Sequence, residues 1–130
     1  MSIKNLSHLS LSTKSLSKVK KFYVDILKCN VVHKFINTKN NELYGYFLSS
    51  GNNTFIEFFK IKKNVKKKSG NIFRHLCFEV TNIYKLRKKL LANSPSRIKR
   101  GKTDGILQFF VKDFENNTVE FHQRDRKSKF

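Results

Sequence analysis

The stretches LSHLSLST (residues 6–13) and FRHLCFEV (residues 73–80) show the same pattern of side chains, and this repeat is the main sequence signal of the fold. In each stretch apolar and polar residues alternate, which is the pattern of a half-buried β-strand. His8 and His75 take equivalent places, each on the face opposite the apolar residues. The repeat indicates that the chain contains two copies of one structural unit.

The segments that follow the two stretches match as well. Apolar residues at helical spacing predict amphipathic helices over residues 16–27 and 82–91, with Ser15 as the N-cap of the first helix and Asn30 as its left-handed end. Three strands are predicted after each helix, at residues 29–36, 42–50 and 53–61, and at 97–100, 105–111 and 118–123. The order is βαβββ in each half, which predicts an α+β fold.

A chain of 130 residues has the length of one ordinary domain. We place module one at residues 3–61 and module two at 72–123. Residues 62–71 are rich in lysine and are predicted to form an extended linker, because like charges repel. Residues 124–130 form a basic tail that is too polar to be anchored, so we expect it to fray.

Composition excludes several classes of protein. Hydrophobic residues make up 38% of the chain, enough for a packed core. The chain has neither an apolar run of the ~18 residues that a membrane span needs nor the pattern of a secretory signal, so we expect a cytoplasmic protein without membrane contact. Cys29 and Cys77 form no CxxC motif, which argues against a disulfide scaffold or a thiolate zinc site, and both are interpreted as ordinary reduced thiols.

The net charge of +19 raises nucleic acid as a partner. The chain contains no helix-turn-helix or RNA-recognition motif, and its bias toward lysine, asparagine and phenylalanine is also what compositional drift toward A and T codons produces. Specific binding to nucleic acid is therefore not predicted. Non-specific binding stays as an alternative, which requires an affinity that falls steeply with salt.

The last predicted strand of each half carries a carboxylate between apolar residues, Glu57 in FIEF (residues 55–58) and Glu120 in TVEF (residues 118–121). An ionised carboxylate without a partner costs at least several kcal/mol at such a place. Alternation puts both carboxylates on the face that carries His8 and His75. Two imidazoles and two carboxylates suit a divalent ion such as Zn, Ni, Co, Mn or Fe. The alternative is structural, with each glutamate paired to a lysine and each histidine a satisfied polar group.

Five stretches resemble blocks of the vicinal oxygen chelate superfamily of glyoxalases, bleomycin resistance proteins and dioxygenases: HLSLST (8–13), KKFYVDIL (20–27), TFIEFF (54–59), RHLCFEV (74–80) and VKDFENNTVEFHQ (111–123). The resemblance implies that the two modules form one curved mixed sheet, a cup with the helices on its outer face and a metal inside. It also implies that the metal ligands are His8, Glu57, His75 and Glu120 and that the protein is a homodimer. The order of these ligands is similar to that of glyoxalase I.

The resemblance further implies an enzyme like lactoylglutathione lyase or an epimerase. In such an enzyme Glu57 or Glu120 removes a proton from a small α-hydroxycarbonyl or hemithioacetal substrate and returns it to the neighbouring carbon of a metal-bound enediolate. The alternative is a non-catalytic small-molecule binding or resistance protein of the same fold. Ser12 and Ile61 stand where glyoxalase I commonly has an Arg and an Asn that contact glutathione. This difference argues against a substrate that contains glutathione.

Three further residues are candidates for substrate binding. Arg100 and Lys102 precede a strand on a loop where a basic side chain can meet an anionic substrate. His122 shares the face of Glu120, two residues further on, and is interpreted as a substrate contact or as a partner of that ligand. Among the many phenylalanines, Phe47 and Phe110 are assigned to packing rather than to the site.

Overall fold

The computed structural model describes residues 2–62 and 73–130, and it divides the chain into two compact units, Met1–Lys67 and Lys68–Phe130. Each unit contains one βαβββ module, so the predicted α+β class and the internal duplication are confirmed. The predicted linker at residues 62–71 lies outside the described residues, except for Lys62. No helix in the described ranges has the length and apolar character needed to span a membrane.

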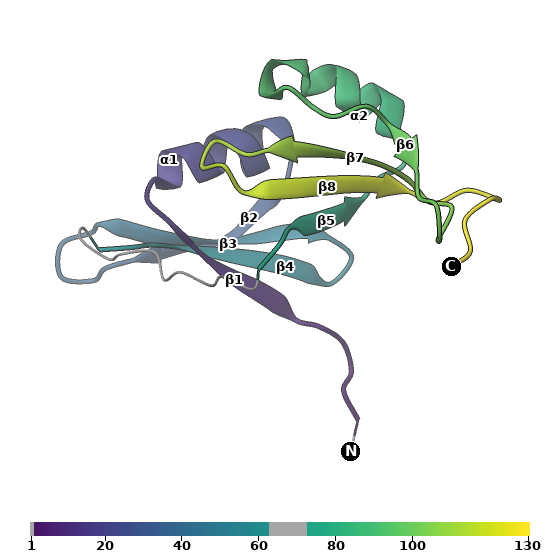
Figure 1. Cartoon of the computed structure of the whole chain (residues 1–130). Coiled ribbons are helices and arrows are strands. Elements are labelled where there is room, and N and C mark those ends of the chain that lie inside the picture. The colour runs from purple at the N-terminus through teal and green to yellow at the C-terminus, as the bar shows by residue number, and fades with distance from the viewer. Residues whose placement is uncertain (1, 63–72) are drawn as a thin grey trace. The chain divides into compact units, whose positions relative to one another are not determined.

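Module one forms a four-stranded sheet with the strand order β1-β4-β3-β2 (Figure 1). Strand β1 runs parallel to β4, and the other neighbours are antiparallel. The elements are β1 (His8–Thr13), α1 (Leu16–Val19), the π-helix η1 (Lys20–Ile26), β2 (Asn30–Ile36), β3 (Leu43–Gly51) and β4 (Thr54–Lys60). Helix α1 packs against β3 and β4.

The first helix begins as predicted but ends earlier. The Ser15 side chain accepts a hydrogen bond from the backbone N–H of Lys18, which confirms the N-cap. The left-handed residue at the end is Lys28 (φ 63°), whereas Asn30 already belongs to β2, so that prediction was wrong. The Lys28 N–H donates to the carbonyl of Val24, and this bond satisfies the helix end two residues before Asn30.

Module two repeats the topology with the strand order β5-β8-β7-β6, and β5 is parallel to β8 (Figure 1). Helix α2 packs against β7 and β8. The elements are β5 (Leu76–Glu79), α2 (Ile83–Lys89), the 3₁₀ turn η2 (Leu91–Asn93), β6 (Lys99–Arg100), β7 (Leu107–Lys112) and β8 (Thr118–Gln123). Strand β8 has the predicted bounds.

Strand β6 is shorter than predicted, and the chain just before it is joined to β7 by one backbone bond and one side-chain bond at Ser96. The Ser96 N–H donates to the carbonyl of Phe110, and the Phe110 N–H donates to the Ser96 hydroxyl instead of a strand carbonyl. Strand β5 is also shorter, so that His75 immediately precedes it. His75 is therefore held by its side-chain contacts rather than by strand pairing.

The core of each module lies on one face of its sheet, toward the helix. In module one the buried side chains are Leu16, Val19, Phe22, Tyr23, Tyr46, Leu48, Ile56 and Phe58; in module two they include Leu76, Ile83, Leu90, Phe109, Val111, Val119 and Phe121. Each large apolar side chain buried in this way contributes about 1.5–3 kcal/mol. Because this face must bury apolar side chains, the strand register is fixed, and the alternate residues point to the other face.

The C-terminal tail is anchored, contrary to the prediction that it frays. The Lys129 N–H donates to the Asp104 carbonyl, and Asp125 makes two hydrogen bonds with the Arg100 guanidinium, at 2.9 and 2.8 Å. Paired charges and backbone hydrogen bonds hold this polar segment in place, and neither kind of contact requires apolar residues.

Candidate metal centre

Module one brings His8 and Glu57 together. Glu57 lies in the middle of β4, opposite Ser10 of the parallel strand β1, and its neighbours Ile56 and Phe58 are buried on the other face. The His8 Nε2 atom is 3.6 Å from the Glu57 Oε1 atom, and the Glu57 side chain is only 16% exposed. At 3.6 Å the contact is longer than a hydrogen bond, so the Glu57 carboxylate is held close to the ring but is not bonded to it.

Module two repeats this pair more tightly. The His75 Nε2 atom is 2.8 Å from the Glu120 Oε2 atom, which is hydrogen-bond distance, and the Glu120 side chain is 11% exposed. Val119 and Phe121, on either side of Glu120, are buried on the helix face. The alternation predicted from the sequence is therefore present in both modules, and it puts each histidine beside the glutamate of its own module.

A phenylalanine completes each pair. The ring of His8 lies edge-on to Phe47 (centroids 5.6 Å apart, 72° between planes), and that of His75 lies edge-on to Phe110 (5.9 Å, 81°). Phe47 is the register partner of Glu57, and Phe110 is that of Glu120. Such edge-to-face contacts favour one ring orientation. Both phenylalanines were predicted to pack in the core; the signal that identifies them is the antiparallel register, which pairs each with a site glutamate.

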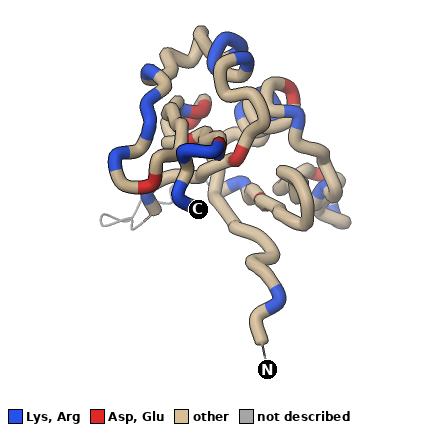
Figure 2. Tube along the Cα trace, turned by 90° about the vertical axis from the view of Figure 1, so that its right-hand side faces the viewer, with Lys and Arg blue, Asp and Glu red and all other residues tan. Residues whose placement is uncertain are grey.

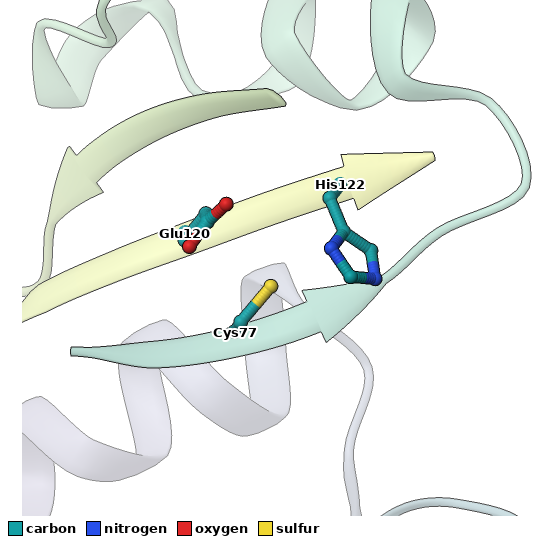
Figure 3. Close-up of side chains that lie close together, drawn as sticks. All are labelled: Cys77, Glu120 and His122. Carbon is teal, nitrogen blue, oxygen red and sulfur yellow. The ribbon is translucent and has the colours of Figure 1, made fainter. Parts of the chain in front are cut away.

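The Cys77 thiol, the Glu120 carboxylate and the His122 ring form a second group of donors in module two (Figure 3). Their ligand atoms all lie within 4.8 Å of one another. Cys77 and Glu120 are register partners on neighbouring strands. Cys77 is an exposed residue, but partial desolvation of its thiol, together with the nearby Glu120 carboxylate, raises the pKa of Cys77 to about 12. Interpreting Cys77 as an ordinary thiol missed this group, although its spacing of two from His75 already places both on one face.

Of the predicted substrate contacts, His122 lies on the face of Glu120 as expected. Arg100 is engaged elsewhere, since its guanidinium donates to the Gly105 carbonyl at 2.6 Å and to Asp125. Lys102 is exposed in the turn after β6. Within residues 73–130, no hydrogen bond or ion pair joins Arg100 or Lys102 to His75, Glu120 or His122.

Glu57 and Glu120 both face a histidine of their own module. In the part of the chain that the structure describes, neither Glu57 nor Glu120 forms an ion pair with either residue type, although basic residues occur along helices, strands and loops (Figure 2). Each carboxylate instead faces an imidazole, and both glutamate side chains are largely shielded from water. Imidazole nitrogen and carboxylate oxygen are the donors that a divalent transition metal accepts. The residues present therefore fit such an ion.

The comparison with family models shows the family. The family model for the Glyoxalase/Bleomycin resistance protein/Dioxygenase superfamily matches residues 5–121, nearly the whole chain. A protein with two βαβββ modules that each direct a histidine and a glutamate to one face has the architecture of that class. The chain belongs to the glyoxalase/bleomycin resistance protein/dioxygenase superfamily, which confirms the resemblance seen in the sequence. No curated protein matches it.

Solved structures show the same fold at low sequence identity. The glyoxalase family protein from Enterococcus faecalis is 21% identical with a TM-score of 0.69, covering 92% of this chain and 97% of that one. The fosfomycin resistance protein FosX from Listeria monocytogenes is 16% identical with a TM-score of 0.71, covering 99% and 100%. The lactoylglutathione lyase from Agrobacterium tumefaciens is 16% identical with a TM-score of 0.67, covering 93% and 94%. At these identities the likeness shows the fold.

Proposed function

We propose that the chain is a metal-dependent enzyme that moves a proton on a small oxygenated substrate, and that His8, Glu57, His75 and Glu120 together hold one divalent ion. The observation that carries the proposal is that each module presents one imidazole–carboxylate pair, and that no lysine or arginine of residues 2–62 and 73–130 forms an ion pair with either carboxylate. Each module thus supplies half of a ligand set. The halves combine within one chain or between the two chains of a homodimer.

The ion, when bound, supplies a positive charge that polarises a substrate carbonyl and makes the adjacent C–H more acidic. The protein's own groups do the rest. Phe47 and Phe110 orient the two imidazoles, and the low exposure of both carboxylates limits their contact with water. A carboxylate on a strand next to a packed core is held in place, which is what a positioned base requires.

Glu57 is the better candidate for the base. Its nearest oxygen lies 3.6 Å from the His8 Nε2 atom, whereas a Glu120 oxygen lies 2.8 Å from the His75 Nε2 atom. A carboxylate with no partner at hydrogen-bond distance is freer to leave the ion and meet a substrate proton. The proton removed from the substrate is therefore held on Glu57 and returned to the neighbouring carbon. The proposed substrates are α-hydroxycarbonyl compounds or hemithioacetals.

Metal analysis and isotope exchange test this function. The purified protein is expected to retain a divalent ion, and His75→Ala is expected to lose it, while His33→Ala, a matched change of an exposed histidine on β2, keeps it. Exchange of the substrate's α-hydrogen with deuterated solvent, followed by NMR, is expected to fall about 10²- to 10⁴-fold in Glu57→Gln, the range that a positioned base contributes. A protein that holds no divalent ion and is unaffected by His75→Ala contradicts the proposal.

A second candidate function is non-catalytic binding of a small molecule. The observation that favours it is an apolar surface beside His8, where Phe47 and Phe55 stack with their ring centroids 5.1 Å apart and 13° between planes. A flat aromatic surface binds apolar ligands without chemistry. This candidate requires a ligand that binds and is released unchanged, with Phe55→Ala weakening the binding and Glu57→Gln leaving it intact.

A further inference from the structure

We propose that module two binds a thiophilic divalent ion of the zinc and cobalt class through the Cys77 thiolate, Glu120 and His122, with no ligand from module one. The proposed site shares Glu120 with the four-ligand set but does not depend on that set. It differs from that set in using a sulfur ligand, and in drawing all its ligands from two neighbouring strands.

Strand geometry places the three donors on one face. Cys77 of β5 pairs in register with Glu120 of the parallel strand β8, and His122 follows Glu120 by two residues on the same side (Figure 3). A tetrahedral ion holds nitrogen, oxygen and sulfur ligands at about 2.0–2.3 Å, which puts the ligand atoms about 3.3–3.8 Å from one another. The three donor atoms already lie within 4.8 Å, so small side-chain rotations complete the geometry.

The comparison of the two modules shows that this group is particular to module two. The register pairs Ser10 with Glu57 in module one and Cys77 with Glu120 in module two, so Ser10 and Cys77 are equivalent. The next pair on the same face is Ser12 with Phe59 in module one and Glu79 with His122 in module two. The modules share their histidine and glutamate, but only module two has a thiol and a second imidazole at these positions.

Local charge favours a cation at this place. The carboxylate of Glu120 borders the thiol, and that of Glu79, held by Arg124 at 2.6 Å, lies on the same strand face. The Glu120 carboxylate attracts a cation, which in turn stabilises the thiolate as its ligand. Glu120 has two oxygens, so one can ligate an ion while the other stays beside the His75 Nε2 atom, 2.8 Å away.

The types of ligand select the class of metal. Thiolate and imidazole prefer Zn²⁺ and Co²⁺ to Mg²⁺ or Mn²⁺, which take mainly oxygen ligands. The other cysteine provides a control within the chain, because Cys29 is buried in module one and belongs to no such group. In the described residues, Cys77, Glu120 and His122 are the one group of three or more potential ligands.

The test is a titration of the full-length, metal-free protein with Co²⁺, followed by the near-ultraviolet charge-transfer band that a cobalt–thiolate bond produces. The band is expected in the wild-type chain and in the double variant His8→Ala/Glu57→Gln, which removes both ligands of module one. Cys77→Ser is expected to abolish it. His122→Ala is expected to weaken Co²⁺ binding by more than about 100-fold, since even the loss of a group that supports a ligand costs about 10–100-fold.

The controls and the contrary results are distinct. Cys29→Ser is expected to keep the band, and His33→Ala is expected to keep the affinity. Circular dichroism is used to confirm that each variant is folded. If Co²⁺ binds without producing the band, if Cys77→Ser binds it as well as the wild type does, and if His8→Ala binds it poorly, this proposal is overturned. That result would support the four-ligand set. A band that the double variant loses also overturns it. If the double variant keeps the band and the activity of the wild type does not depend on metal, the site in module two is upheld. The same result contradicts the proposed function.

Discussion

Two phenylalanines on neighbouring strands of module two test the assignment of the sheet faces. Phe121 of β8 is 1% exposed and packs against Phe109 and Phe78, with ring centroids 5.2 and 5.8 Å away. Phe110 of β7 is half-buried on the opposite face, against His75. The same substitution to alanine therefore removes a core side chain in one case and a wall of the candidate site in the other.

The two changes are expected to differ in cost. Phe121→Ala leaves a cavity in a packed layer, and such truncations lower the free energy of unfolding by about 3–5 kcal/mol. Phe110→Ala loses about half of a phenylalanine's burial, roughly 1 kcal/mol, and an edge-to-face contact worth about 0.5–1.5 kcal/mol. The total for Phe110 is about 2 kcal/mol.

Urea unfolding followed by far-ultraviolet circular dichroism measures both values on the full-length chain. The expected order is wild type, then Phe110→Ala, then Phe121→Ala, with about 1–3 kcal/mol between the two variants. Equal losses, or a larger loss for Phe110→Ala, would show that the face bearing Glu120 is itself packed as a core. The metal centre would then have no room on that face, and the reasoning from the alternation would be refuted.

Three further predictions concern the backbone and the tail. Lys28→Gly is expected to raise the free energy of unfolding by up to about 1 kcal/mol, because a left-handed residue with a Cβ costs about 1–2 kcal/mol and glycine does not; an unchanged or lower midpoint in urea would contradict the left-handed helix end. Gly105→Ala is expected to lower the thermal midpoint, because its φ of 71° is left-handed and an added Cβ would meet the Lys127 carbonyl oxygen; a midpoint equal to that of the wild type would show that the tail does not lie there. The pKa of Asp125 is lowered to about 2, mainly by hydrogen bonding from Arg100, so the anchoring of the tail is complete above about pH 4 and is lost as the pH falls through about 2. An NMR titration that finds Asp125 at its ordinary pKa would refute this pairing.

The fold was predictable because its decisive signals are local and repeated. Alternation in the stretches around His8 and His75 gave the strand faces, and Ser15 gave the start of the first helix. The position of Lys28 at the helix end was not predictable, because asparagine is the usual non-glycine residue at such a place and the π-helical turn before it leaves no clear sequence signal.

The site was predictable in part, for a different reason. The pairing of each histidine with the glutamate of its own module follows from alternation together with parallel strand pairing. The roles of Phe47 and Phe110 depend on the antiparallel register of the strands. Turns and bulges set that register, so it cannot be read from composition. The Arg100–Asp125 pair joins residues on separate elements, and in a chain so rich in basic residues no sequence pattern selects that partner.

The pattern of ion pairs provides an independent argument for the function of the strand glutamates. In a chain with 28 basic and 9 acidic residues, a carboxylate on the surface meets a lysine or arginine readily. Asp25, Glu42, Glu79 and Asp125 do so in the structure. Glu57 and Glu120 face histidines instead, and they are more buried than those four carboxylates, so an unpaired charge costs more there. A divalent cation bound to both groups offsets that charge, and this is the physical reason for proposing the paired residues as metal ligands.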